Sequence, residues 1–230
     1  MQIRAHRRQA TLLVLAVGIV GMTFGVLADA AGLSLFKVAA MSALVFTGAS
    51  QFAAVGVIAG GGSGPAALGS AMLLAARNAL YGPVVARAVP DSVGGRLVAS
   101  HFVIDETTAM SSMQESTEDA TDAFWFTSIA LWTLWLLGSI SGAVIGSVLG
   151  DPETLGLDAA FPASFVAMIA PHLRTAPARF VALCAAGLAL ATIPLTPAGV
   201  PLLVAAIAVV PGAELARRKS FNAGEGASDS

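Results

Sequence analysis

The chain has 230 residues, of which 56% are hydrophobic and 11% are charged, and its mean hydropathy is +0.80. Soluble globular chains carry about 25% charged residues, so this composition excludes an ordinary soluble domain and predicts an integral membrane protein with several spans. The formal net charge is −2, and no basic patch is interleaved with aromatic residues, which excludes a nucleic-acid-binding surface.

Seven apolar runs are predicted to cross the membrane. A helix needs about 20 apolar residues to cross a hydrocarbon core about 30 Å thick. The predicted spans are 10–28, 35–59, 65–89, 123–149, 159–173, 178–193 and 200–210. The segment 90–122 is polar and amphipathic, and the tail 213–230 is expected to be disordered. We therefore predict an all-α membrane protein with a single transmembrane domain over residues 1–212.

Two glycine pairs suggest an internal repeat. Gly21 and Gly25 in the first span, and Gly142 and Gly146 in the fourth, each precede a Gly-Leu pair and a new apolar run. If spans one to three correspond to spans four to six, the copies are inverted, as in many transporters, with one helix left over. The alternative is that both pairs serve only close helix packing. Prolines in the last three spans predict broken helices, or alternatively mark helix ends.

The basic residues leave the orientation open. With seven spans, eight lysines and arginines fall on the side of the C-terminus, against Arg4, Arg7 and Arg8 on the other. Positive residues favour the cytoplasm, yet a basic N-terminus usually also stays there. Either one signal is overruled or one segment does not cross fully. The second run, broken at Gly48, and the polar segment 90–122 are the candidates.

Arg77 is a charged residue inside the predicted third span. An arginine at the centre of a membrane helix costs about 2.5–3.5 kcal/mol on insertion scales, so it should face protein or water. We interpret it as a substrate-binding residue whose guanidinium engages a carboxylate, with a structural ion pair as the alternative. Asn78 and Tyr81 are predicted to extend this surface, because Arg77 and Tyr81 would lie one helical turn apart.

Residues 47–51, Thr-Gly-Ala-Ser-Gln, interrupt the second span. Gly48 and Ser50 weaken a helix here, and an unwound turn would present N–H groups to a carboxylate and carbonyls to an ammonium. Gly48, Ser50, Gln51 and the apolar Phe52 are therefore predicted to bind substrate. The alternative is a continuous helix in which Gln51 bonds across to a neighbour.

His101, Asp105 and Glu106 are the candidates for proton or ion coupling. If this segment is helical, His101 and Asp105 form an i,i+4 pair, and a buried histidine and carboxylate can carry a proton. The alternative is an amphipathic surface helix with solvated charges. The acidic residues that follow, up to Asp122, are expected to be solvated.

Asp158 and Pro162 lie at the start of the fifth span. Asp158 is expected to cap that helix, and the alternative is that the two residues form a gate. No HxxEH, CxxC, GxSxG or P-loop pattern occurs in the sequence. We therefore expect no metal, no cofactor, no ATP use and no enzymatic activity.

Four stretches are distinctive: LVFTGASQFAAVGVI, AARNALYGPVVA, IDETTAM and GLDAAFPASF. Together they resemble the AzlC family, the large subunits of branched-chain amino acid exporters, known as azaleucine-resistance permeases. The resemblance implies a secondary transporter in the bacterial inner membrane that exports branched-chain and similar aliphatic amino acids with a small AzlD-type partner subunit. Two other hypotheses stay open: an uncoupled channel or permease for another small solute, and a non-transporting membrane scaffold.

Overall fold

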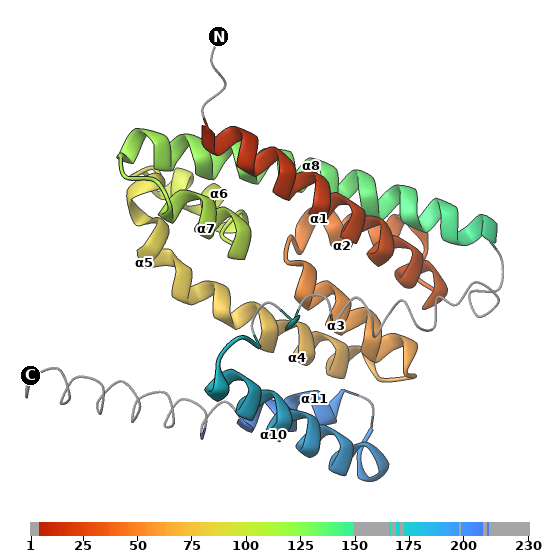
Figure 1. Ribbon diagram of the computed structural model, residues 1–230. Helices are drawn as coiled ribbons and strands as arrows, with labels where there is room; N and C mark the ends of the chain where they lie inside the picture. Colours follow the sequence, from red (N-terminus) through yellow and green to blue (C-terminus); the bar gives the residue numbers. More distant parts are fainter. Residues whose placement is uncertain are drawn as a thin grey trace, which may run out of the picture.

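Figure 1 shows the computed structural model of the chain, which describes residues 5–149, 166, 169–170, 173–197, 199–208 and 211. Within these ranges every regular element is a helix, and there is no strand. Three helical stretches are long and apolar enough to cross a membrane: His6–Ala30, Thr117–Val148 and Ala176–Leu195. The predicted class, an all-α membrane protein with several spans, is confirmed, whereas the count of seven spans is not.

Two long helices, α1 (Ala5–Ala30) and α8 (Thr117–Leu149), lie side by side and run in the same direction (Figure 1). Asp122 joins their N-terminal ends, because its Oδ2 lies 2.6 Å from His6 Nε2 and accepts a hydrogen bond from Arg7 Nε at 2.9 Å. Asp122 is therefore not the solvated residue that we expected. It holds the first turns of the two helices together.

Glycines bring the backbones of α1 and α8 into contact. A Cβ atom at Gly25 would lie 2.0 Å from the carbonyl oxygen of Ser139, and one at Gly142 would lie 2.0 Å from that of Met22. The glycine pairs that suggested a repeat thus pack on each other, as the alternative interpretation proposed. Because the two helices are parallel, the first and fourth predicted spans are not inverted copies, and the predicted correspondence of spans one to three with four to six does not hold.

The predicted second span, 35–59, is wrong as a single crossing. It forms two short helices, α2 (Leu35–Leu44) and α3 (Gly48–Ala59), separated by the non-helical residues 45–47. At about 1.5 Å per residue these helices are about 15 and 18 Å long, so neither crosses a core of about 30 Å.

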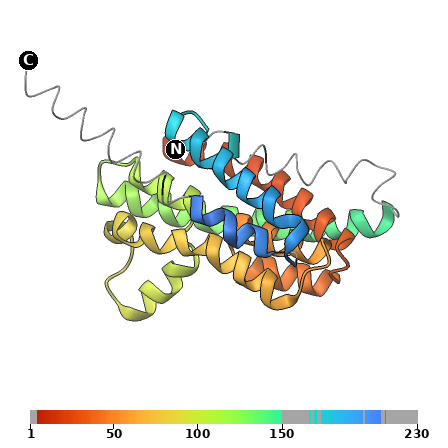
Figure 2. The ribbon, with the colours of Figure 1, turned by 90° about the horizontal axis from the view of Figure 1, so that it is seen from below.

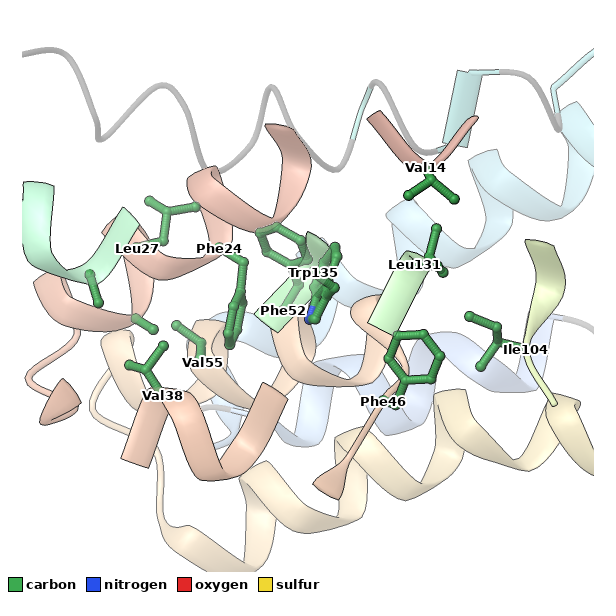
Figure 3. Packing of buried hydrophobic residues seen from close by; sticks show 12 residues of the cluster. Val14, Phe24, Leu27, Val38, Phe46, Phe52, Val55, Ile104, Leu131 and Trp135 are labelled. Carbon is green, nitrogen blue, oxygen red and sulfur yellow. The ribbon is translucent and has the colours of Figure 1, made fainter. Parts of the chain in front are cut away.

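The two helices fold back on each other as a hairpin. Gln51 Nε2 donates to Ser42 Oγ at 3.4 Å, and Val38 and Val55 belong to one buried cluster, where they are neighbours in Figure 3. Pairing of the end of α2 with the start of α3, and of the start of α2 with the end of α3, means that the helices are antiparallel. The chain therefore enters and leaves at the same end of the molecule, as a re-entrant hairpin does.

The predicted third span is an almost continuous helical rod. It consists of α4 (Gly64–Ala75), the 3₁₀ helix η1 (Ala76–Tyr81), α5 (Gly82–Val85) and the 3₁₀ turn η2 (Ala86–Ala88). With the rises of the two helix types the rod is about 40 Å long, enough to cross a membrane. It runs back along α3 toward the N-terminal end of α8 (Figure 1).

The polar segment 90–122 contains a second hairpin. It consists of α6 (Val93–His101) and α7 (Asp105–Ser112), separated by residues 102–104. α7 runs antiparallel to α8, and near its end Ser111 Oγ donates to the carbonyl oxygen of Ala120 at 3.1 Å. This hairpin enters from the end of the molecule opposite to the α2–α3 hairpin (Figure 1).

The tips of the two hairpins meet inside the molecule. The ring centroid of Phe46 lies 6.0 Å from that of Phe102, edge to face, and also 6.0 Å from that of His101, where the rings stack. Because α6 ends at His101 and α7 begins at Asp105, the predicted i,i+4 pair of these two residues is wrong. The chain turns between them, and His101 packs among aromatic rings instead.

The C-terminal helices pack below α4, as Figures 1 and 2 show. They are α10 (Ala176–Thr192), η5 (Ile193–Leu195), α11 (Val200–Ala205) and η6 (Ala206–Ala208). The first two coincide with the predicted sixth span, and the last two are too short to cross a membrane. Asp158, Pro162 and the tail 213–230 lie outside the described residues.

Candidate functional site

A cavity of about 140 Å³ lies where the tips of both hairpins reach the two long helices. We call it the central cavity, and Figure 3 shows several of the buried residues around it. Its lining residues are Val17, Val20, Phe46, Thr47, Gly48, Ala49, Phe52, Arg77, Ile104, Asp105, Glu106, Leu131 and Trp135. Those from α1 and α8 come from the middle of each helix, so the cavity lies about halfway along the molecule.

Arg77 and Asp105 form an ion pair at this cavity. Arg77 Nη2 lies 2.9 Å from Asp105 Oδ2. The alternative of a structural ion pair thus describes part of the role of Arg77. Yet Arg77 Nε and Asp105 Oδ1 are buried and, within the part of the chain that the structure describes, have no hydrogen-bond partner. Buried polar atoms are nearly always paired, so this donor and this acceptor are unusual.

The start of α3 faces the same cavity. Thr47 precedes the helix in an extended conformation (φ −152°, ψ 99°), and its side chain makes no capping hydrogen bond. The first N–H groups of a helix have no intrahelical acceptor and carry partial positive charge. Gly48 and Ala49 bring these groups to the cavity wall. The break in the helix thus lies at 45–47, just before the predicted site.

Trp135 is a site residue that sequence reasoning missed. Its ring lies against Gly48, where a Cβ atom would come within 2.9 Å of Trp135 Cη2. Its indole Nε1 is buried and has no acceptor among the described residues, whereas Trp132 Nε1 donates to the carbonyl oxygen of Ala43 at 3.1 Å. Its position at the centre of a span, rather than at a membrane interface, is the signal that could have found it.

The other predicted substrate-binding residues lie beside the cavity. Ser50 and Gln51 are fully buried in α3 but do not line it. Gln51 donates to Ser42 of α2, while its Oε1 has no partner in the described ranges; the alternative of a continuous helix is wrong, because the chain breaks between α2 and α3. Asn78 and Tyr81 also lie outside the lining. Of the seven predicted residues, the cavity therefore brings together three: Gly48, Phe52 and Arg77.

The 3₁₀ geometry of η1 changes the expected relation of Arg77 and Tyr81. With three residues per turn, positions four apart are not stacked as in an α-helix. Both side chains nevertheless lie near Asp105, Arg77 through the ion pair and Tyr81 through its hydroxyl. A 3₁₀ stretch in the middle of a helical rod often marks a functional hinge.

Two of the three predicted coupling residues line the cavity. Asp105 and Glu106 form the first turn of α7, and His101 lies apart from both. The two carboxyl groups therefore lie with Arg77 at the same cavity wall.

Comparison with known proteins places the chain in a family. A family model described as AzlC protein matches residues 13–149, which is more than half of the chain. An uncharacterized membrane protein of Helicobacter pylori (strain ATCC 700392 / 26695) is 27% identical over 153 residues, covering 65% of this chain and 66% of the relative. This chain thus spans just under two thirds of that relative's length. No solved structure matches. The matched residues contain both hairpins and every residue that lines the central cavity, and the chain belongs to the AzlC family of membrane proteins.

Proposed function

We propose that this protein is a secondary transporter that exports branched-chain and similar aliphatic amino acids across the bacterial inner membrane. The observation that carries the proposal is the central cavity. It is buried halfway along membrane helices and offers groups of both signs beside an apolar wall. Intramembrane ionisable residues are rare and are typical of transport pathways.

Each part of a zwitterionic amino acid has a partner in the cavity. The carboxylate is bound by Arg77 Nε and by the free N–H groups at the start of α3. The ammonium group is bound by Asp105 Oδ1. The aliphatic side chain packs on Val17, Val20 and Leu131. An apolar wall separates solutes that differ by one methylene by only about 1–3 kcal/mol, so we expect several aliphatic amino acids to be accepted.

The re-entrant hairpin also supports one of the two orientations that the basic residues left open. When 35–59 turns back instead of crossing, the start of α1, the end of the rod and the α6–α7 hairpin lie at one end of the molecule, and the start of α2 lies at the other (Figure 1). The first end carries Arg7, Arg8, Arg87 and Arg96, and the second carries Lys37. Positive residues favour the cytoplasm. We therefore infer that the N-terminal end of α1 is cytoplasmic, and that solute leaves at the end where α1 terminates.

We also propose that the chain works with a small AzlD-type subunit. The resemblance to the AzlC family suggests such a partner, and α10 offers a surface for it. Phe180, Leu183, Leu190 and Ile193 are all exposed on α10 and the turn that follows. In a membrane such a face contacts either lipid or another subunit.

The proposal is tested by leucine exchange in proteoliposomes. The purified chain, alone and together with the small subunit, is reconstituted with unlabelled leucine inside, and radiolabelled leucine is added outside. We expect uptake of radiolabelled leucine. An excess of unlabelled valine or isoleucine should inhibit this uptake, and an excess of lysine should not. Absence of exchange above protein-free liposomes in both preparations would overturn the proposal. Exchange with no response to a proton or ion gradient would favour the uncoupled permease.

Glu106→Gln should remove the proton dependence of transport. A neutral amide can neither bind nor release a proton, so net leucine transport should no longer respond to a proton gradient, whereas leucine exchange continues. In the wild type the carboxyl group of Glu106 loses its proton as the pH rises, so gradient-driven transport should fall with rising pH. The measurement is the initial rate of net transport against pH.

Glu115→Gln is the matched control, because Glu115 is exposed and lies outside the central cavity. It should leave the pH profile unchanged. If Glu106→Gln also keeps the wild-type pH profile and the response to the gradient, Glu106 is not the coupling residue.

A further inference from the structure

A second, larger cavity lies beside the central one. It has a volume of about 540 Å³ and runs between α3, α4 and the C-terminal helices. We call it the lateral cavity. Its lining residues are Phe52, Ala53, Gly56, Val57, Gly60, Leu74, Ile193, Thr196, Gly199, Pro201 and Leu202. It follows α3 from its middle to Gly60, beyond its last turn, and so extends from the level of the central cavity toward the end where α1 terminates.

Phe52 is the boundary between the two cavities. Among the described residues that line either cavity, Phe52 is the one that they share. It is fully buried, and its ring lies edge to face against Phe24, with centroids 5.5 Å apart, and against Trp135, with centroids 6.4 Å apart. The aromatic ring thus stands between the polar groups of the central cavity and the space beyond.

The lateral cavity has features of a solute path. Gly56 and Gly60 lie on the same face of α3, so this wall of the cavity carries no side chain at these two positions. Its C-terminal wall includes Thr196 and Gly199, which lie outside the helices. At membrane depth, non-helical backbone is tolerated where it is buried in protein or lines a water-filled space.

We propose that Phe52 is a gate between the central and lateral cavities, and that the lateral cavity is the exit route for solute on the non-cytoplasmic side. The inference rests on the proposed transport function and extends it to the path. When the Phe52 ring swings away from Phe24 and Trp135, the two cavities join, and a solute at Arg77 reaches the outer end of α3. With the ring in the observed position, the central cavity is closed on that side.

The gate is tested by cysteine labelling, which does not depend on transport. Cys184 is the only cysteine in the sequence, so the background is Cys184→Ser. Thr47→Cys reports on the central cavity and Gly56→Cys on the lateral cavity. A membrane-impermeant thiol reagent is applied to right-side-out and to inverted membrane vesicles.

We expect Gly56→Cys to react with the reagent from the outside, both in the protein with Phe52 and in the Phe52→Ala variant. Thr47→Cys should react from the outside slowly, and Phe52→Ala should raise that rate roughly tenfold, as when a conformer populated about a tenth of the time becomes the only one. Labelling of the same cysteine from the cytoplasmic side is the internal reference for folding. Phe52→Met, which keeps most of the volume but is flexible, should give an intermediate rate.

Phe24→Ala is the matched control, because Phe24 packs on the same ring but lines neither cavity. It keeps the Phe52 ring between the cavities, so outside labelling of Thr47→Cys should rise less than in Phe52→Ala. An equal outside rate with and without the Phe52 ring would overturn the gate even if leucine transport is intact. A faster rate in a protein that transports no leucine would support the gate and overturn the proposed substrate.

Discussion

Arg77→Gln should lower leucine exchange in proteoliposomes by about 10- to 100-fold, because a hydrogen bond to a charged group contributes about 1.5–3 kcal/mol. Glutamine keeps a polar side chain but cannot supply the charge that binds a carboxylate. The loss of the ion pair alone should cost less, since the side chains of Arg77 and Asp105 are 41% and 36% exposed and water screens them. The measurement is the exchange rate as a function of leucine concentration.

The double variant Arg77→Gln with Asp105→Asn separates binding from structure. If the pair serves only the fold, removing both charges should restore protein yield, thermal stability and exchange together. If Arg77 binds the carboxylate, the double variant should be stable and still inactive. Arg96→Gln is the matched control, because Arg96 forms an exposed ion pair with Asp91 at 3.2 Å. Wild-type exchange by the double variant would show that Arg77 has no role in binding.

The polar residues of the site could be predicted because burying a polar residue in an apolar helix is energetically unfavourable, and such a residue can be recognised from its immediate sequence neighbours. A charge within an apolar run stands out from the sequence alone, and Arg77 and Gly48 both line the central cavity. The pairing of Arg77 with Asp105 could not be predicted, because nothing in the sequence relates residues that two different helices bring together. Trp135 was missed for a related reason. An apolar span predicts that an indole is buried, but it does not show whether the indole N–H finds a hydrogen-bond acceptor.

The hairpins show where prediction from apolar length fails. An apolar run of the length of 35–59 fits both a straight span and two half-length helices folded on each other, and only Gly48 and its polar neighbours hint at the second. The polar segment 90–122 misleads in the opposite way. Its composition fits a surface helix, which was the alternative for Asp105 and Glu106, but both residues line a cavity inside the molecule. In both cases the fold is decided by contacts between the hairpin tips, such as that of Phe46 with Phe102.

An inverted relation does occur in the structure, but between units that are smaller than the three-span units suggested by the sequence. α1 is followed by the α2–α3 hairpin, and the rod that begins with α4 is followed by the α6–α7 hairpin. The two long elements run in opposite directions, and their hairpins enter from opposite ends (Figure 1). Each of these two units crosses the membrane once. The second unit therefore begins on the opposite side of the membrane and has the opposite orientation. The groups that we propose to bind solute then lie where the units meet, as transporter sites commonly do.

Gly142→Ala should destabilise the protein by about 3 kcal/mol, the upper end of what an added methyl group costs in a close-packed site. The new Cβ atom would lie 2.0 Å from the carbonyl oxygen of Met22 and 2.9 Å from its Cα. These are backbone atoms, so relief requires α1 and α8 to separate. Gly138, whose Cβ would lie 2.5 Å from the carbonyl oxygen of Gly18, would lose its own contact as the helices part.

Gly69→Ala is the matched control, because Gly69 also lies within a helix and a Cβ atom there meets nothing within 4 Å. Alanine is favoured over glycine in a helix by about 1 kcal/mol, so this variant should be as stable as the wild type or more so. The measurement is the midpoint of thermal unfolding in detergent, together with protein yield. Because α1 and α8 both form walls of the central cavity, Gly142→Ala should also reduce leucine exchange per folded molecule. Equal midpoints for the two variants would mean that the glycine contact between α1 and α8 does not hold the site together.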